Sequence, residues 1–325
     1  MKHRIIQEGL CYRLRPITVI DAEKVVELRT LDQNIYVHPI STDPVEQVEW
    51  IKSYEHREGD YYFAIENRLT SEVEGLIGIY NMEKGQGEWG RWVIRPGSLA
   101  AVESVELLYR IAFERLSLTK LYCRTIINNT NVVSFHDSIG ELRGDILRGY
   151  CEINGKLYDA VEHYSNKEHF QLHIQHSLNE KAFKIFTRML KRLLGRFEFH
   201  HVGAAVRDIQ KELTNFRILG YKCESQLFED PLQGIKGLFI ISNGQPRIEL
   251  LANMENHHTL DQYIEKGTKF YHFAYLVLDF DMAMAVFKNM RAKVISEPKI
   301  SVYFKERISF IMLPNMLLIE LIETK

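Results

Sequence analysis

The last third of the chain contains the same pattern twice, and this repeat constrains the fold more than any other feature. His201 lies in FHHVGAAV and is followed by Glu249 in RIELLAN. His272 lies in YHFAYLVL and is followed by Glu320 in LLIELIE. From 201 to 249 and from 272 to 320 the interval is 48 positions, and the copies are 71 positions apart. Because unpartnered ionisable groups are costly in such apolar runs, the repeat predicts one metal site built from two modules.

Each copy of the repeat is predicted to form a strand, a helix and three further strands. The helices are expected at 208–219, ending at Gly220, and at 281–291. Asn243-Gly244 is a hairpin signal in the first copy. The segment 257–267 is expected to join the copies as a helix.

The first 169 residues alternate between strand-like and helical patterns. Apolar residues from Ala101 to Leu116 recur at helical spacing, which is typical of a helix packed on a sheet. The other predicted helices are 21–31, 43–55 and a short one that ends at Gly140. The predicted strands are 12–17, 61–66, 75–82, 88–94, 121–127, 150–153 and 156–163.

The connector, residues 170–196, is predicted to be a helix. Ser177 and Glu180 give a capping-box signal for its start, and Gly195 ends it. One side is apolar and most of the other is basic. Such a helix can bind a membrane surface or a partner, or it can dock between two domains with its charges in water. We favour the docked helix.

Composition limits the class of protein. The chain has 325 residues, enough for two domains with full cores, and it is 46% hydrophobic and 26% charged. A net charge of −2 gives no reason to expect nucleic acid as a partner. No run approaches the roughly 18 apolar residues of a membrane span. The 4 cysteines are scattered without a CxxC pair, so neither disulfides nor a zinc–thiolate site is indicated. We expect a cytoplasmic enzyme.

Residues 10–169 resemble the GNAT acetyltransferase family, closest to its ribosomal-protein and amino-sugar N-acetyltransferase branch. EWGRWVI resembles the family's fourth strand, and SVELLYRIAFERLSLTKLYCRTIINNT resembles the cofactor helix with the strand after it. NTNVVSFHDSIG matches the family's Asn-to-Gly helix. The resemblance implies an α+β domain with a mixed, mainly antiparallel sheet and helices on both faces. It also implies acetyl-CoA as the co-substrate.

The resemblance assigns roles to residues of this domain. Glu88 stands where the family often has a general base, although a salt-bridged edge carboxylate is the alternative. His136 replaces the Tyr that usually protonates the departing thiolate, although it could instead be a helix residue facing solvent. The residues expected to contact acetyl-CoA are Val93, Ile94, Gly97, Ser98, Leu99, Ala100, Ala101 and Asn129.

The cofactor loop departs from the family pattern. An exposed helix N-terminus suits a pyrophosphate, because its N–H groups and dipole face the anion. Leu99 stands where the second Gly of the loop is expected, and Arg95 is one place out of register. Losing that Gly limits how closely backbone can approach phosphate. A degenerate or purely binding GNAT domain is therefore the alternative to acetyl transfer.

Residues 197–325 resemble the vicinal oxygen chelate (VOC) superfamily, which includes glyoxalase I, methylmalonyl-CoA epimerase, extradiol dioxygenases and bleomycin-resistance proteins. The resemblance implies paired βαβββ modules whose curved sheet holds a metal. His201, Glu249, His272 and Glu320 carry over as its ligands. They imply one divalent ion (Zn, Ni, Co, Mn or Fe) that stabilises an enediolate next to a carbonyl, with Glu320 as the expected base.

Two departures limit the choice of VOC reaction. Leu232 stands where the epimerases have a second catalytic carboxylate, with Glu229 and Asp230 a little earlier. Four ligands argue against the extradiol dioxygenases, which typically use three. The remaining histidines of this region, His200, His257 and His258, have no partner in the repeat and are expected to be ordinary surface or loop residues.

The sequence therefore predicts two domains, 1–169 and 197–325, joined by a helical linker at 170–196. We expect an acetyl-CoA-dependent N-acetyltransferase for a small amine or amino sugar, fused to a metal-dependent VOC isomerase, epimerase or lyase. One alternative is a VOC domain that only binds a small molecule, as resistance proteins do. Another is a GNAT half that binds an acyl-CoA for the VOC half. Small molecules are the expected partners, and a homodimer is compatible with the sequence.

Overall fold

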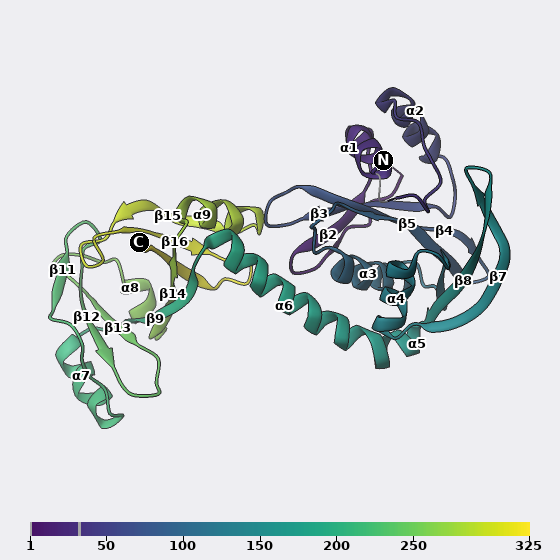
Figure 1. Cartoon of the computed structure of the whole chain (residues 1–325). Coiled ribbons are helices and arrows are strands. Elements are labelled where there is room, and N and C mark those ends of the chain that lie inside the picture. The colour runs from purple at the N-terminus through teal and green to yellow at the C-terminus, as the bar shows by residue number, and fades with distance from the viewer. Residues whose placement is uncertain (1, 32–33) are drawn as a thin grey trace. The chain divides into compact units, whose positions relative to one another are not determined.

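The computed structural model describes residues 2–31 and 34–325, which form two compact units (Figure 1). The first unit extends to Thr187 and the second comprises Arg188–Lys325. Helix α6 (Gln175–Leu194) includes the boundary between them.

The first unit is built on an eight-stranded sheet of order β1-β2-β3-β4-β5-β6-β8-β7. The described pairs of neighbouring strands are antiparallel except β5 with β6, which is parallel. This agrees with the predicted mixed, mainly antiparallel sheet. The strands are β1 (Gln7–Glu8), β2 (Tyr12–Pro16), β3 (Tyr61–Asn67), β4 (Val73–Glu83), β5 (Gln86–Ile94), β6 (Lys120–Ile126), β7 (Leu142–Ile153) and β8 (Lys156–Asn166).

Helices cover both faces of this sheet (Figure 1). A 3-10 turn (Val19–Asp21), α1 (Ala22–Arg29) and α2 (Pro44–Tyr54) lie on one face. On the other lie α3 (Ala101–Arg110), which continues as a π-helical turn (Ile111–Arg115), and α4 (Thr130–Ile139). The first face buries one apolar cluster of helix and strand residues, which includes Val25, Leu28, Ile51, Tyr54, Tyr62, Ala64, Leu76 and Val93.

The predicted start of the connector helix at Ser177 is wrong. Helical structure begins at Lys167 and runs without a break through α5 (Lys167–His169), a π-helical segment (Phe170–Ile174) and α6. Asn166 caps it, because its side-chain oxygen accepts the N–H of His169 at 2.7 Å. The early start buries Phe170 against Tyr109 and Phe113. The helix ends before Gly195, as predicted, at a φ of +64°.

The second unit contains a nine-stranded sheet made of two equivalent halves. Its path is β10-β12-β13-β9-β14-β17-β16-β15, and β11 pairs with β12. The halves meet where β9 pairs antiparallel with β14. The strands are β9 (Phe197–Ala205), β10 (Lys222–Cys223), β11 (Phe228–Asp230), β12 (Ile235–Ile241), β13 (Ile248–Asn253), β14 (Phe270–Val277), β15 (Lys293–Ile300), β16 (Arg307–Met312) and β17 (Leu318–Glu323).

This arrangement confirms the two predicted βαβββ modules, with one difference. The first of the three strands that follow the helix in the first module is divided into β10 and β11. The module helices are α7 (Ile209–Ile218) and α9 (Phe280–Asn289), which begin after caps from Asp208 and Asp279. The joining helix, α8, is limited to Asp261–Glu265.

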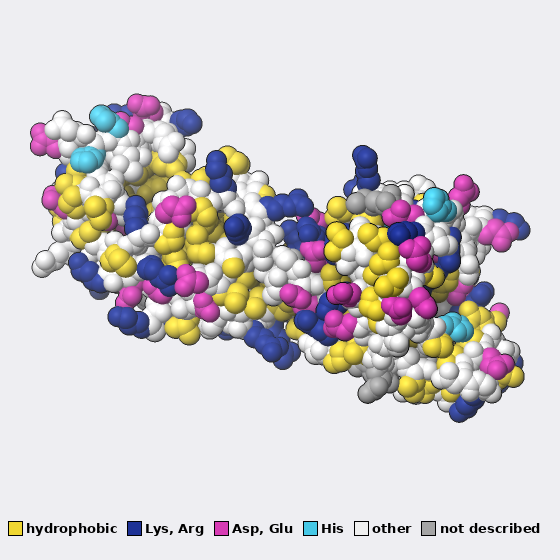
Figure 2. All heavy atoms as spheres, turned by 90° about the horizontal axis from the view of Figure 1, so that it is seen from above, with side chains coloured by type: hydrophobic (Ala, Val, Ile, Leu, Met, Phe, Trp, Pro, Cys, Tyr) yellow, Lys and Arg dark blue, Asp and Glu magenta, His cyan; other side chains and the backbone are white. Residues whose placement is uncertain are grey.

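The surface mixes charges of both signs. On the face in Figure 2, Lys and Arg side chains are interspersed with Asp and Glu over both units. Within the described residues, none of the helices combines the length and apolar character needed to cross a membrane.

Replacing Phe170 by Ala should destabilise the first unit. The ring is 2% exposed and stacks on Tyr109 with a 4.9 Å centroid distance, so its removal leaves a cavity. The expected cost is about 3–5 kcal/mol in the free energy of unfolding, measured by urea denaturation. Phe183→Ala is the matched control, because Phe183 is on the same helical segment and is 60% exposed. Equal losses for the two variants would contradict this packing.

Candidate functional sites

The register of the central strands of the second unit brings the four predicted metal ligands into two rows. On β9 and β14, His272 lies opposite Gly203 and His201 lies opposite Ala274. Glu249 of β13 neighbours Gly203, and Glu320 of β17 neighbours Ala274. The first row is therefore Glu249, Gly203 and His272. The second is Glu320, Ala274 and His201, and the two-fold relation of the modules exchanges them.

The donor atoms of these four residues converge. His201 Nε2 lies 3.1 Å from Glu249 Oε2 and 3.3 Å from His272 Nε2. Glu320 Oε2 lies 3.5 Å from each of the two Nε2 atoms, and His272 Nε2 lies 3.8 Å from Glu249 Oε2. A tetrahedral ion with bonds of about 2.1 Å separates its ligands by about 3.4 Å. The observed spacing fits a metal of that size.

Burial at this site favours the uncharged forms of its side chains. It lowers the pKa of His201 to about 3, so the imidazole is neutral and able to ligate a metal. It also raises the pKa of Glu249 to about 7, which an added cation would reverse. Glu320 Oε2 and His272 Nδ1 are buried without hydrogen bonds among the described residues. Two such orphaned groups in one cluster fit a site made for a cation.

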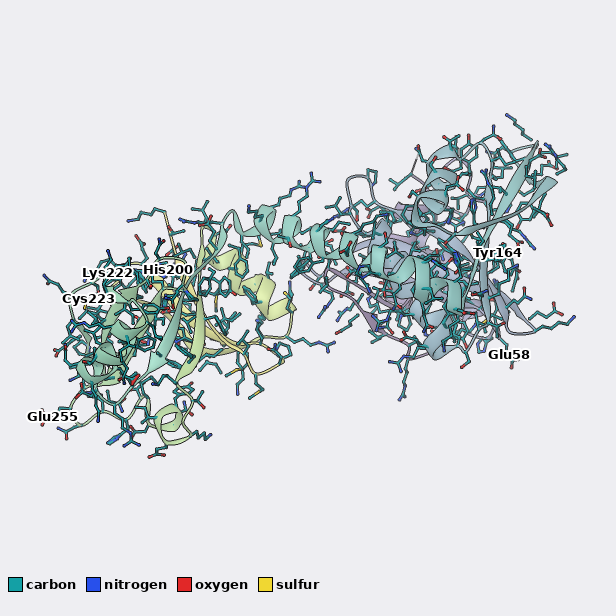
Figure 3. All side chains as sticks on the ribbon, turned by 90° about the horizontal axis from the view of Figure 1, so that it is seen from below. Glu58, Tyr164, His200, Lys222, Cys223 and Glu255 are labelled. Carbon is teal, nitrogen blue, oxygen red and sulfur yellow. The ribbon has the colours of Figure 1, made fainter. Side chains whose placement is uncertain are left out.

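His200 was predicted to be an ordinary surface or loop residue, and this is wrong. His200, labelled in Figure 3, lies with its Nδ1 2.8 Å from Nδ1 of His201 and contacts Arg247. The reason is a shift in strand register: Ala274 faces His201 but Tyr275 faces Phe199, so His200 is the extra residue of a bulge. A bulge re-aims a side chain, and here it brings His200 beside the ligand.

Two aromatic residues near the donors were missed by the sequence reasoning. Phe239 packs edge-on against His201 at 5.1 Å, and Phe310 packs edge-on against His272 at 5.2 Å. They pair with Glu249 and Glu320 on the adjacent strands. The residue numbers 239 and 310 differ by the same 71 positions as the histidines. The 71-residue interval of the repeat could therefore have identified Phe239 and Phe310 from the sequence.

Asp230, the carboxylate nearest to Leu232 in the sequence, is hydrogen-bonded within a turn. Leu232 is 79% exposed, whereas Asp230 is buried. Asp230 accepts the backbone N–H of Gln233 at 3.1 Å and its side-chain amide at 2.8 Å. A cation that sequence reasoning missed, Lys299, lies near Asp230 and Glu320, and burial lowers its pKa.

In the first unit, the site is formed where β5 and β6 separate. These strands pair only from Gln86 opposite Lys120 to Glu88 opposite Tyr122. Beyond that point lies a cavity of about 220 Å³ with Glu88, Asn129 and His136 in its lining. An adjoining cavity of about 290 Å³ is lined in part by Val93, Ile94 and Asn129. The structure thus brings five of the predicted site residues to this gap.

Glu88 is a buried carboxylate on a central strand, so the edge position in the alternative is wrong, whereas the expected ion pair is present with Arg124. It accepts a hydrogen bond from Asn81 at 2.9 Å, and the hydroxyl of Tyr150 lies 3.4 Å away. Arg124 Nη1 is 3.8 Å from Glu88 Oε2. Glu88 also lines a larger cavity of about 660 Å³, so it borders two spaces in which reactants could meet.

His136 is buried, so the alternative in which it faces solvent is wrong. Its Nδ1 lies 2.8 Å from Oε2 of buried Glu141, whose other oxygen accepts the hydroxyl of Tyr109 at 2.6 Å. Cys123 Sγ lies 3.5 Å from His136 Nε2. Cys123, His136 and Glu141 offer three buried donor atoms in one group, and the sequence reasoning assigned no role to Cys123 or Glu141.

The predicted cofactor loop occupies the N-terminal end of α3. Gly97 has a φ of +79°, and Ala100 is fully buried next to the first helical residue, Ala101. The hydroxyl of Ser98 donates to Glu74 at 2.5 Å, so this side chain is already engaged within the protein. None of residues 97–101 is among the residues that line the two cavities at the strand gap.

Comparisons with known proteins match two separate parts of the chain. Residues 12–140 match the family model "Acetyltransferase (GNAT) domain". Residues 200–310 match the model "Glyoxalase/Bleomycin resistance protein/Dioxygenase superfamily". No curated protein matches the chain significantly. Residues 12–140 are therefore similar to a GNAT acetyltransferase domain, and residues 200–310 are similar to the glyoxalase, or VOC, superfamily.

Similar solved structures are GNAT enzymes. A GCN5-related N-acetyltransferase from Brucella melitensis is 16% identical, with a TM-score of 0.48, over 57% of this chain and 86% of that one. A chimera of spermidine N-acetyltransferase SpeG from Vibrio cholerae with hSSAT is 19% identical, with a TM-score of 0.46, over 50% and 98%. FdhC, described as a nucleotide-linked sugar GNAT, is 23% identical, with a TM-score of 0.44, over 58% and 99%.

Replacing Gly203 by Ala should displace a metal ligand without removing it. A Cβ at this position would lie 1.9 Å from Cε1 of the His272 ring, so the imidazole must move. We expect metal affinity to fall about 10- to 100-fold, as for other changes that misorient a ligand, measured by competition with a chromophoric chelator. Gly144→Ala, in strand β7, is the control, since its nearest contact is 3.3 Å. Unchanged affinity in the Gly203 variant would show that His272 is not a ligand.

Proposed function

We propose that the first unit transfers the acetyl group of acetyl-CoA to the amine of a small acceptor. The observation that carries this proposal is the buried carboxylate of Glu88 at the end of the β5–β6 pairing, on the border of two cavities. The thioester would enter the gap between β5 and β6, and the amine would enter the larger cavity.

Each step of this transfer has a residue suited to it. Glu88 takes a proton from the incoming ammonium, directly or through water, so that the nitrogen lone pair can attack the acetyl carbonyl carbon. The carbon–sulfur bond breaks, the nitrogen loses its second proton to solvent to give the amide, and the departing thiolate receives a proton from His136. Glu141, with Oε2 2.8 Å from His136 Nδ1, would position the ring.

Replacing Glu88 by Gln should remove the base and keep the shape of the site. We expect kcat to fall about 100-fold or more, measured as free CoA released in the presence of an amine acceptor. Binding of acetyl-CoA, measured by calorimetry, should be preserved. Glu83→Gln is the control, because Glu83 lies at the end of the neighbouring strand β4 and its side chain is 79% exposed. If the Glu88 variant keeps wild-type kcat, Glu88 is not the base.

We propose that the second unit is a metal-dependent enzyme that removes a proton next to a carbonyl group. His201, Glu249, His272 and Glu320 would hold one divalent ion. Such an ion supplies Lewis-acid stabilisation of the negative charge that develops on the substrate oxygen. We propose that Glu320 would leave the ion to act as the base, because no hydrogen bond among the described residues holds its buried Oε2 in place.

The surroundings of the site support this chemistry. Phe239 and Phe310 flank the two imidazoles and limit the access of water to them. Phe304, from the loop between β15 and β16, stacks on His201 at 6.2 Å. A dry site strengthens electrostatic stabilisation of developing charge. The buried turn role of Asp230 favours a reaction that uses one base rather than two.

Replacing either Glu249 or Glu320 by Ala should abolish stoichiometric metal binding. Each change removes one of four donor atoms and leaves a buried gap, so the affinity should fall by more than the roughly 10- to 100-fold of outer-shell changes. Metal content is measured by inductively coupled plasma mass spectrometry after dialysis. His258→Ala is the control, since this side chain is exposed and bonds only to Asp261 among the described residues. Retention of the ion in both Glu variants would refute the assignment.

A further inference from the structure

Arg29 is distinguished among the charged residues of the largest of the three cavities described above. This cavity, of about 660 Å³, contains both signs of charge. Its charged or titratable side chains, tyrosines apart, are Arg29, His38, Glu46, Glu88 and Arg91. Arg91 is paired with Asp60 through contacts of 2.6 and 2.9 Å, and its guanidinium lies 4.5 Å from the ring centre of Tyr80. Its charge is therefore already balanced by the protein.

Arg29, by contrast, has no counter-ion among the described residues. One Nη2 hydrogen bond goes to the backbone oxygen of His38 at 2.8 Å, which fixes the side chain at the end of α1. Its Nε is buried and makes no hydrogen bond among the described residues. An arginine usually satisfies such donors with a carboxylate or a phosphate, which its planar fork binds through two parallel bonds.

A second unpaired donor lies beside it. The side chain of Tyr62 is 1% exposed and lies close to the Arg29 guanidinium, and both residues line the cavity. The Tyr62 oxygen can accept from the adjacent Arg29 guanidinium, but its O–H proton has no acceptor among the described residues. Two unsatisfied donors that face the same space would both be satisfied by one anionic acceptor group.

The same cavity offers complementary groups for the rest of such a molecule. Glu88 can receive an ammonium group, and the rings of Trp50, Tyr80 and Tyr150 form apolar parts of the wall. Aromatic surfaces of this kind pack against flat, partly apolar groups, including the faces of sugar rings. The cavity therefore combines a free guanidinium, a carboxylate and aromatic walls.

We propose that Arg29 and Tyr62 form an anion-binding subsite for the amine acceptor, so that the acceptor carries a phosphate or a carboxylate in addition to its amine. This inference rests on the proposed acetyl transfer and names the substrate class of that site. Arg29 binds the anionic group while the amine reaches Glu88. Plain polyamines, which carry only positive charge, are then poor acceptors.

The test compares charged and neutral amines as ligands, without acetyl-CoA, by isothermal titration calorimetry. The phosphate arm uses glucosamine 6-phosphate against glucosamine, and the carboxylate arm uses β-alanine against its amide. The wild-type protein should bind at least one anionic probe about 10- to 100-fold more tightly than its neutral partner, as expected for charge-assisted hydrogen bonds. The arm that shows the difference identifies the anion.

Variants of Arg29 test whether this residue causes the preference for anionic probes. Arg29→Gln should remove the preference for the anionic probe and leave binding of the neutral probe unchanged, and Arg29→Lys should restore part of it. Arg115→Gln, at an exposed position that lines none of the three cavities described above, should behave as the wild type. Equal wild-type binding of charged and neutral probes in both arms would overturn the inference, as would a preference that survives in Arg29→Gln.

A parallel assay of acetyl transfer separates this inference from the proposed function. If the wild type prefers an anionic probe through Arg29 but acetylates none of the four amines, the subsite stands and the proposed transfer fails. If it acetylates glucosamine and glucosamine 6-phosphate with equal kcat/KM and binds them equally, the transfer stands and the subsite is refuted.

Discussion

The proposed metal site depends on the register of one pair of strands, the antiparallel pairing of β9 with β14. This register places His272 opposite Gly203 and His201 opposite Ala274, so the two imidazoles meet across the axis that relates the modules. A shift of one residue would turn every side chain of a strand to the other face of the sheet. The small residues opposite the histidines are part of the same constraint, because a Cβ at Gly203 would overlap the His272 ring. The positions of His201 and His272 therefore follow directly from the register of β9 and β14.

The first unit relies on a comparable local feature, the loss of pairing between β5 and β6 after Glu88. Backbone groups and side chains beyond this point face a gap rather than a neighbouring strand. The gap next to Glu88 is bounded by Asn129, which precedes α4, and by His136 of α4. Arg29 lines the same cavity and adds a charge that no described carboxylate balances.

Much of this could be predicted from the sequence, because a strand has a period of two and a repeat fixes equivalent positions. The equal His-to-Glu intervals identified all four donors that converge in the second unit. The bulge at His200 could not be predicted, since it appears only in the pairing of β9 with β14. The burial of His136 depends on Tyr109 and Glu141, which are brought to it by tertiary packing. The early start of the connector helix depends on the packing of Phe170, which overrides the capping signal at Ser177.

The central claim is that the duplicated module builds one metal site from two histidines and two glutamates. X-ray absorption at the metal edge of the purified protein tests it directly, because imidazole, oxygen and sulfur donors scatter differently. We expect two imidazole nitrogens with oxygen donors at about 2.0–2.2 Å and no sulfur. A sulfur shell would contradict the claim and would point to the other buried donor group, Cys123 with His136 and Glu141. A shell with a single imidazole would contradict it as well.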